Sequence, residues 1–487
     1  MDEPLDCESA GSVVEPTIGS EIMKSETPIQ QHPDNGHYFL FRGRPTILIT
    51  SAEHYGAVLN AEFDYVTYLN ELQKHGLNQT RAWSGTYRET ATSFGIADNT
   101  LNPRRYLAPW ARSGDGTKYD LNQWDPAYFD RLKDFLTQAG RRGVVVEYGL
   151  FCSFYSDELW AVSPMNPINN VNGLSDCSRA EVFALGRTDI LAVQENFVRK
   201  VVRELRDFDN VYFEICNEPY ITNICNRWQA HIAEVIADVE KDMPVKHLIA
   251  QNIANGTGKI EQPHPAVSIF NFHYAKPPEA VAQNYALNRV IADDETGFAG
   301  KADVTYRREA WEFILAGGGV YSNLDYSFTT AHPRGDLTEH NAPGGGSAAL
   351  RRQLKILRDF IESFDFIHMK PGNEMVRSGV VTAPLAGVPA QANVTVRVLA
   401  GDGYALYISG GERVELRLEL PSGDYEAQWI NTCTGATDKA DRFNHQGGAR
   451  TLTSPAYTED IALRILPRAG NTGVEKSVGA SGRVACG

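Results

Sequence analysis

Short runs of apolar residues alternate along the middle of the chain with stretches whose apolar residues recur about once per helical turn. Apolar runs of this kind are typical of buried parallel strands, and the stretches between them are typical of amphipathic helices. The pattern predicts eight strands, which begin at Thr46, Leu77, Gly143, Asn210, Lys246, Val267, Arg289 and Gly318. Helices are predicted between them, and only the connection after the fifth strand is short and non-helical.

Eight strands with helical crossovers within about 330 residues predict an α/β fold, a (β/α)8 TIM barrel, rather than an open sheet. An open doubly wound sheet is the alternative, but no G-x-G-x-x-G motif follows an early strand. The predicted barrel spans residues 37–369. A hairpin around Arg42-Gly43 is expected to lead into its first strand.

After the barrel the spacing changes to alternation of apolar and polar residues. Residues 370–469 are therefore predicted to form a small all-β sandwich of antiparallel strands, with turns at Asp402-Gly403 and Pro421-Ser422-Gly423. We expect this domain to pack against the barrel. Residues 1–36 are polar and are predicted to form a flexible N-terminal arm, and residues 470–487 are predicted to form a C-terminal tail.

Charge and composition exclude several classes of partner. The net charge of −15 argues against nucleic acid and against an anionic membrane surface, and no stretch is long and apolar enough to span a bilayer. The first residues lack the basic start and apolar run of a signal peptide, which favours a soluble, cytoplasmic protein over a secreted one. The seven cysteines show no C-x-x-C spacing, which argues against a zinc site. Neither a metal nor a cofactor is expected. The sequence specifies no oligomeric state.

Two strand ends carry the candidate chemistry, because functional groups of a TIM barrel lie at the C-terminal ends of its strands. The fourth strand ends in Asn217-Glu218-Pro219, and the seventh ends in Asp293-Asp294-Glu295. Two facing carboxyl groups suit glycosidic cleavage with retention, in which one protonates the leaving oxygen and the other attacks the anomeric carbon. The acid then needs a raised pKa. Strand alternation would point Asp294 away from the pocket, which favours Glu295 as the attacking group.

The segment VYFEICNEP, followed later by Glu-Thr-Gly, resembles the clan A glycoside hydrolases, particularly cellulase-like family-five enzymes, over residues 37–369. The resemblance implies that Glu218 is the acid/base, that Glu295 is the nucleophile and that Asn217 binds the sugar 2-hydroxyl. It also implies that Arg81 contacts the nucleophile, and that Tyr274, beside His273, can donate a hydrogen bond to it.

Other residues at strand ends are candidates for sugar contact. Glu53 and His54 follow the first strand and lie in the right layer to bind hydroxyl groups, although a buried core histidine has a similar pattern. Flat aromatic rings stack well on sugars, and the aromatic candidates are Trp83, Trp160, Tyr274 and Tyr326. Two departures from the family leave the sugar open. Strand three carries Glu147-Tyr148 near where His or Asn is common, and strand eight lacks the usual tryptophan.

The expected function is that of a retaining glycoside hydrolase, which cleaves β-glycosidic bonds in oligo- or polysaccharides by double displacement. Long loops at about residues 84–124 and 152–180 favour short or chain-end substrates. The alternatives are a transglycosidase, which uses the same residues, and an inactive carbohydrate-binding barrel. The presence of both glutamates together with Arg81 argues against the inactive barrel.

Overall fold

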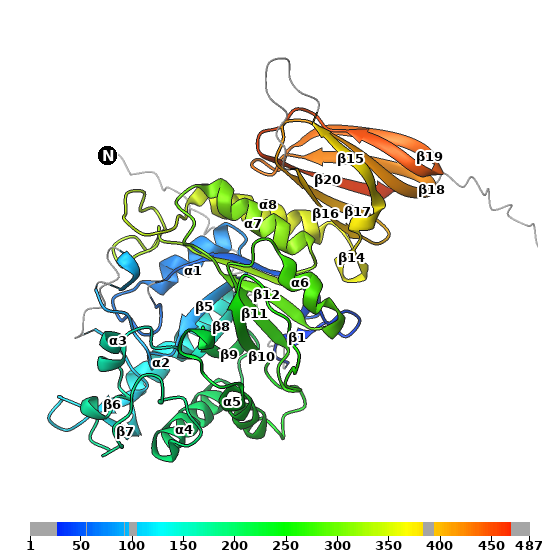
Figure 1. The fold of residues 1–487 in the computed structure, drawn as a ribbon. Coiled ribbons are helices and arrows are strands. Elements are labelled where there is room, and N and C mark those ends of the chain that lie inside the picture. The colour runs from blue at the N-terminus through cyan, green and yellow to red at the C-terminus, as the bar shows by residue number, and fades with distance from the viewer. Residues whose placement is uncertain (1–26, 55, 92, 97–104, 383–393, 469–487) are drawn as a thin grey trace, which may run out of the picture.

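The computed structural model describes residues 27–54, 56–91, 93–96, 105–382 and 394–468. Among these residues, eight parallel strands form a single sheet that curves into a barrel, as predicted (Figure 1). Neighbouring strands follow one another in the chain, and the eighth strand returns to pair with the first. The barrel strands are β4 (Leu48–Ala52), β5 (Gln79–Trp83), β8 (Val145–Cys152), β9 (Val211–Asn217), β10 (Ile249–Asn255), β11 (Ile269–His273), β12 (Val290–Glu295) and β13 (Val320–Leu324).

The barrel closes between β4 and β5 through a side chain. The backbone N–H of Ile49 donates to Asn78 Oδ1 at 2.9 Å, and Asn78 Nδ2 donates to the carbonyl of Ile47 at 2.8 Å. A buried amide thus satisfies backbone groups that an ordinary strand ladder would pair. The predicted (β/α)8 fold class is confirmed.

Helices surround the barrel in the gaps where the spacing predicts them. Helix α2 begins with Asp125, which accepts a hydrogen bond from the N–H of Ala127 at 2.9 Å, and with a proline in the first turn. The α-helices are α1 (Tyr65–Lys74), α2 (Pro126–Arg141), α3 (Asp157–Ala161), α4 (Thr188–Leu205), α5 (Asn226–Val239), α6 (Glu279–Asn284), α7 (Asp303–Leu315) and α8 (Ala348–Glu362). The link between β10 and β11 contains no helix, as expected.

Shorter elements occupy the loops. A two-stranded hairpin, β6 (Trp110–Arg112) and β7 (Tyr119–Trp124), lies in the long loop after β5. The 3-10 helices are η1 (Ser93–Gly95), η2 (Pro167–Asn169), η3 (Pro219–Thr222), η4 (Tyr285–Leu287), η5 (Phe366–His368) and η6 (Asn373–Met375). None of the helices in the described ranges has both the length and the apolar composition that crossing a bilayer requires.

A three-stranded sheet, β1 (Gln30–Gln31), β2 (Phe39–Phe41) and β3 (Arg44–Thr46), closes the bottom of the barrel. Arg42 and Gly43 form its predicted hairpin turn, with φ of 50° and 72°. Its apolar side chains pack with the first residues of the barrel strands, in the cluster Ile29, Phe39, Phe41, Leu48, Val145, Tyr212, Leu248, Ala250, Ile269, Val290, Ala292 and Val320.

The boundary predicted for the N-terminal arm is therefore too late. Residues 27–36 belong to the barrel floor, because Ile29 is fully buried there and β1 pairs with β2. The remainder of the predicted arm, residues 1–26, lies outside the described residues, as does the predicted tail, residues 470–487.

The C-terminal domain is antiparallel, as predicted, and its described strands belong to one hydrogen-bonded sheet. The turn at Asp402-Gly403 is confirmed, but the turn predicted at Pro421-Ser422-Gly423 is wrong, because one strand runs through it. Its buried residues change there from even to odd positions, which broke the alternation in the sequence. The strands are β14 (Lys370–Pro371), β15 (Val376–Thr382), β16 (Thr395–Ala400), β17 (Tyr404–Ser409), β18 (Val414–Ile430), β19 (Thr437–Thr453) and β20 (Asp460–Pro467).

The sheet packs against helix α7 of the barrel (Figure 1). Trp311 stacks on Tyr407, with ring centroids 5.3 Å apart. Next to this pair, the buried guanidinium of Arg307 donates to both carboxylate oxygens of Asp460, at 2.9 and 3.0 Å. The two domains are therefore joined by a stacked aromatic pair and a buried, bidentate ion pair.

We expect Asp460→Ala to lower the free energy of unfolding by about 3–5 kcal/mol, because it leaves the buried charge of Arg307 without its main partner. Glu459→Ala is the matched control, since Glu459 pairs with the same arginine at 3.0 Å but its side chain is 45% exposed. The control should cost under about 1 kcal/mol. Denaturant unfolding of the two variants checks this, and equal losses would contradict it.

Candidate active site

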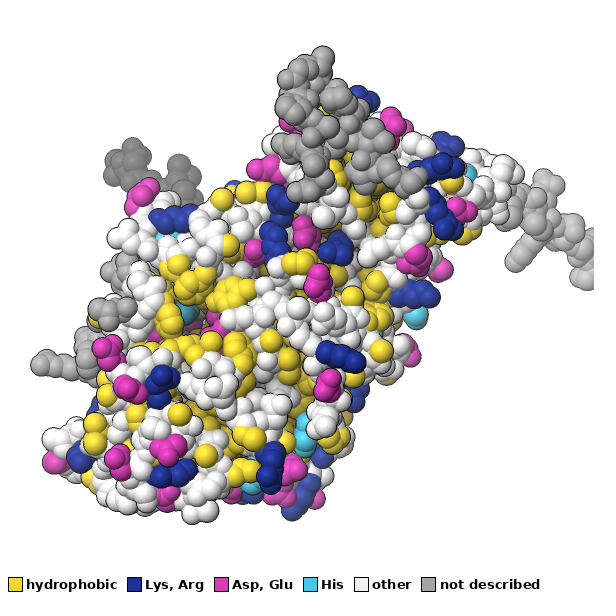
Figure 2. Space-filling view, viewed as in Figure 1, with side chains coloured by type: hydrophobic (Ala, Val, Ile, Leu, Met, Phe, Trp, Pro, Cys, Tyr) yellow, Lys and Arg dark blue, Asp and Glu magenta, His cyan; other side chains and the backbone are white. Residues whose placement is uncertain are grey.

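A cavity of about 410 Å³ opens at the C-terminal ends of the barrel strands. In the space-filling view, hydrophobic side chains flank a hollow in which acidic and histidine side chains are visible (Figure 2). The cavity contains Glu218 and Glu295, as the strand ends predict. It is lined by His54, Gly56, Leu59, Trp83, Tyr87, Arg88, Glu89, Phe94, Cys152, Tyr155, Asn217, Glu218, Ile221, Asn255, Tyr274, Glu295, Phe298 and Leu324.

Glu218 follows β9 directly and has a left-handed backbone, with φ of 46°. Such a conformation is unfavourable for a residue with a side chain and persists only where neighbours hold it. Its N–H donates to Asn252 Oδ1 at 3.0 Å, and its carbonyl accepts from Ser153 Oγ at 2.6 Å. These bonds fix the turn that directs the carboxyl group into the cavity.

The carboxyl group of Glu218 lies against His273, with Oε1 3.0 Å from Nδ1, and accepts from the Tyr220 hydroxyl at 3.1 Å. Burial raises the pKa of Glu218. The hydrogen bond from His273 and the charge of His273 lower the pKa by more, so the net shift is downward. Burial lowers the pKa of His273, whereas the charge of Glu295 and the bond to Glu218 raise it above its ordinary value. When the pair holds a single proton, these opposite shifts place it on His273 rather than on Glu218. A raised pKa was expected for Glu218 from the sequence, but in the structure the pKa is lowered.

Glu295 ends β12 and is 8% exposed. Its Oε2 accepts from Arg81 Nη1 at 2.7 Å, and its Oε1 accepts from the Tyr274 hydroxyl at 3.1 Å. One carboxylate oxygen of Glu295, one of Glu218 and a ring nitrogen of His273 lie within 4.8 Å of one another. The two carboxyl groups predicted from separate strands thus face each other across a short gap.

Arg81, on β5, is the centre of a buried ionic cluster. Its Nη2 donates to Asn217 Oδ1 at 2.9 Å and to Glu214 Oε2 at 3.1 Å, and lies 3.4 Å from Asp294 Oδ2. Its Nε lies 3.7 Å from Glu147 Oε2. One guanidinium therefore faces buried carboxyl groups from β8, β9 and β12, in addition to Glu295.

One positive charge cannot balance that many buried carboxylates, so some of them must hold protons. Burial, opposed by Arg81, raises the pKa of Glu147 to about 7. Burial and the charge of Glu147 raise the pKa of Asp294 well above its ordinary value. Asn271 Nδ2 donates to both carboxyl groups, at 2.6 and 2.9 Å. The interior beneath the cavity is therefore partly protonated at neutral pH.

As expected, Asp294 does not line the cavity, but its side chain does not lie on the opposite side of the strand from Glu295. Strand alternation placed it opposite Glu295, but both side chains reach Arg81, at 3.4 and 2.7 Å. The register between β11 and β12 shifts at this point, because Phe272 pairs with Asp293 whereas His273 pairs with Glu295. This irregularity brings two consecutive carboxyl groups to one guanidinium.

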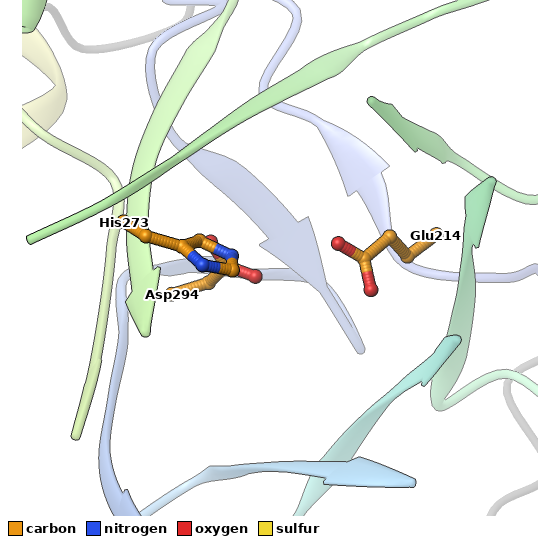
Figure 3. Close-up of side chains that lie close together, drawn as sticks. All are labelled: Glu214, His273 and Asp294. Carbon is orange, nitrogen blue, oxygen red and sulfur yellow. The ribbon is translucent and has the colours of Figure 1, made fainter. Parts of the chain in front are cut away.

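Glu214, His273 and Asp294 also converge within 4.8 Å of one another, in a geometry that could hold a metal ion (Figure 3). His273 and Asp294 lie side by side in the close-up, and Glu214 faces them from across the barrel. However, Arg81 Nη2 lies 3.1 Å from Glu214 and 3.4 Å from Asp294. The guanidinium supplies the positive charge that a metal would bring, and repulsion between the two cations opposes metal binding here.

The other predicted residues divide into two groups. His54 and Trp83 line the cavity, where His54 Nε2 lies 3.1 Å from Glu89 Oε2 and Trp83 stacks under Arg81 at 4.6 Å. Three other candidates lie outside the cavity lining. Glu53 accepts from the N–H groups of Gly56 and Ala57, Trp160 donates to the carbonyl of Cys177 in the core, and Tyr326 is buried behind His54.

The structure adds residues that the sequence analysis missed. Tyr155 accepts a hydrogen bond from Asn217 Nδ2 at 2.9 Å, and Tyr220 donates to Glu218. Tyr220 is only two residues after Glu218, so its contact with the Glu218 carboxyl group could have been predicted from the sequence. Tyr155, Glu89 and Phe298 lie on loops, where no periodicity indicates which side chain turns inward.

The fold matches those of solved glycoside hydrolases. One structure, described as a glycoside hydrolase, has a TM-score of 0.62 and 13% identity, with 91% of this chain and 97% of that chain covered. A glycoside hydrolase family 5 protein from Bacteroides vulgatus ATCC 8482 has a TM-score of 0.61 and 13% identity, with coverage of 90% and 93%. At these identities the likeness is one of fold, and it extends over the barrel and the C-terminal sheet.

No protein-family model matches the sequence, and no curated protein matches it either. The structural neighbours nevertheless confirm the predicted resemblance to clan A barrels at the level of the fold.

The raised pKa of Glu147 predicts how stability depends on pH. Because the folded protein binds this proton more tightly than the unfolded chain does, the associated stability is lost as pH rises from about 4.5 to about 7. We expect Glu147→Gln, which stays neutral, to lose less stability than the wild type between pH 5 and pH 8. Denaturant unfolding at both pH values measures this. Glu415→Gln, at an exposed strand position, should behave as the wild type does, and an unchanged decline in Glu147→Gln would contradict the argument.

Proposed function

We propose that the protein is a retaining glycoside hydrolase that cleaves β-glycosidic bonds by double displacement. The observation that carries this proposal is the approach of Glu218 and Glu295, whose nearest carboxylate oxygens lie within 4.8 Å in one cavity. Retaining enzymes place their two carboxyl groups about 5–5.5 Å apart, whereas inverting enzymes leave about 6.5–9.5 Å for a water molecule. The short separation supports direct attack by a carboxylate.

Glu295 is the nucleophile in this proposal. Arg81 donates to one of its oxygens and Tyr274 to the other, which orients the carboxylate and stabilises its negative charge. In the first step one oxygen of Glu295 bonds to the anomeric carbon while the bond to the leaving oxygen breaks. The product is a covalent glycosyl ester on Glu295.

Glu218 is the acid/base. In the free protein His273 holds the proton of the pair, as the opposite pKa shifts indicate. A sugar that displaces water from the cavity penalises this separated charge and favours the neutral pair, in which Glu218 carries the proton. Glu218 then donates it to the leaving oxygen. In the second step Glu218 takes a proton from water, whose oxygen displaces Glu295 from the anomeric carbon.

Asn217 supports the same assignment. Its Oδ1 accepts from Arg81 and its Nδ2 donates to Tyr155, so both ends of the amide are held beside the nucleophile. The amide lines the cavity and is thereby positioned for a hydroxyl group of the bound sugar. A contact to the 2-hydroxyl would strengthen as the oxocarbenium-like transition state forms.

We also propose short or chain-end substrates. Phe94 and Phe298, from the loops after β5 and β12, approach each other with ring centroids 6.4 Å apart. This contact at the cavity wall leaves little room for a polymer that passes through. Incubation with a β-linked polysaccharide should release mono- or disaccharide with little early loss of viscosity. A rapid fall in viscosity with little small sugar released would refute the chain-end proposal.

A panel of nitrophenyl β-glycosides, which have good leaving groups, and methyl β-glycosides, which have poor ones, tests the catalytic assignment. Replacing the nucleophile (Glu295→Ala) should lower kcat/KM by at least about 10³-fold, and replacing the acid/base (Glu218→Ala) should cost about 10²–10⁴-fold on substrates with poor leaving groups. Azide should rescue both variants and give an inverted α-azide with Glu295→Ala and a retained β-azide with Glu218→Ala. Unchanged turnover in either variant would remove that residue from the assignment. Glu459→Ala, remote from the cavity, is the control for activity.

A further inference from the structure

Exposed apolar side chains are concentrated at the mouth of the cavity. Among the described residues, six large hydrophobic side chains are more than a third exposed, and three of them line this cavity. They are Phe94, Ile221 and Phe298, which are 41%, 44% and 43% exposed, and we call them the apolar rim. Scattered exposed apolar residues are ordinary, but a group around one cavity marks a binding surface.

The apolar rim is continuous with the catalytic residues through edge-to-face ring contacts. Phe94 packs against Tyr155 at 5.1 Å, and Phe298 packs against Tyr274 at 6.0 Å. Phe94 and Phe298 contact each other at 6.4 Å. Tyr155 bonds to Asn217 and Tyr274 bonds to Glu295, so a ligand that reached the two catalytic glutamates would also touch the rim.

The position of Ile221 shows which part of a substrate meets the rim. Ile221 lies in the turn after Glu218, and its N–H donates to the carbonyl of Glu218 at 3.0 Å. In the proposed reaction Glu218 protonates the leaving oxygen, and Ile221, three residues further along the chain, lines the same cavity, which associates the rim with the leaving-group side. His54 and Asn217, two polar lining residues suited to sugar hydroxyls, are buried far more deeply than the rim.

We propose that the apolar rim binds the leaving group of the substrate, and that it favours an apolar aglycone, an alkyl or aryl alcohol, over a second sugar. The inference rests on the proposed function and narrows its substrate class. A second sugar can stack one face on an aromatic ring, but the three side chains of the rim offer no hydrogen-bond partner, so hydroxyl groups that face them lose water without gaining hydrogen bonds. An alkyl chain or an aromatic ring would instead cover the exposed apolar area and gain by leaving water.

A series of methyl, butyl, hexyl and octyl β-glycosides of one accepted sugar tests this, used below the concentration at which octyl glycosides form micelles. These alcohols differ mainly in apolar length, so bond reactivity stays nearly constant along the series. We expect kcat/KM to rise by about threefold to fourfold for each methylene that the rim buries. Equal values for the methyl and octyl glycosides would overturn the proposal.

Variants locate the effect. Phe94→Ala, Ile221→Ala and Phe298→Ala should each reduce the octyl-to-methyl ratio of kcat/KM by at least about fivefold, because each removes apolar surface that the chain covers. Ile168→Ala is the matched control, because Ile168 is 62% exposed and does not line the cavity. Its ratio should equal that of the wild type. An unchanged ratio in all three rim variants would also overturn the proposal.

Calorimetric binding of the same glycosides to the wild type and Phe298→Ala separates this proposal from the proposed function. Hydrolysis with a flat chain-length series would remove only the aglycone assignment. Chain-length-dependent binding that Phe298→Ala abolishes, with no hydrolysis of any glycoside, would remove only the enzymatic assignment. Neither hydrolysis nor such binding would remove both. A wild type that dimerises in light scattering, with a monomeric Phe298→Ala, would show instead that the rim is a surface between two copies.

Discussion

The interaction on which the rest of the site depends is the placement of one guanidinium inside a barrel lined with carboxyl groups. Arg81 pairs with Glu295 at 2.7 Å and lies within 4 Å of Glu147, Glu214 and Asp294. Without it, these buried groups would repel one another and take up further protons. Because Arg81 also bonds to Asn217, the same side chain aligns the ends of strands four and seven. The electrostatic balance of the interior and the geometry of the two glutamates therefore have one origin.

The barrel could be predicted from sequence because its strands are buried on both faces and leave short, nearly continuous apolar runs. All eight predicted strands are present. The start of α2 at Asp125-Pro126 could be predicted from these two residues alone. The C-terminal sheet was less predictable. Strand β18 continues through Pro421-Ser422-Gly423 because pairing with β19 overrides the local turn preference, and its change of buried face is visible only in three dimensions.

The site was predictable where function follows from strand position. Arg81, Glu218, Glu295 and Tyr274 are brought together by parallel strands whose C-terminal ends face the cavity. Three of them end or follow their strands, and Arg81 lies two residues before the end of β5. It was not predictable where a register shift or a loop decides. The shift at His273 brought Asp294 to Arg81, and the loop after β8 directed Trp160 into the core and Tyr155 toward Asn217. The location of the shared proton also depends on distances that a sequence does not contain.

The floor of the barrel is closed, which affects the order in which reactants and products enter and leave the cavity. The β2–β3 hairpin and Ile29 fill the bottom with side chains, so substrate, leaving group and water use the same end of the barrel. In the proposed reaction, the departing alcohol occupies the mouth of the cavity, through which water must enter for the second step. The alcohol must leave before water can enter, and an alcohol that stays bound competes with water for the glycosyl group. In this proposed reaction the closed barrel floor therefore affects how the glycosyl group is divided between hydrolysis and transfer.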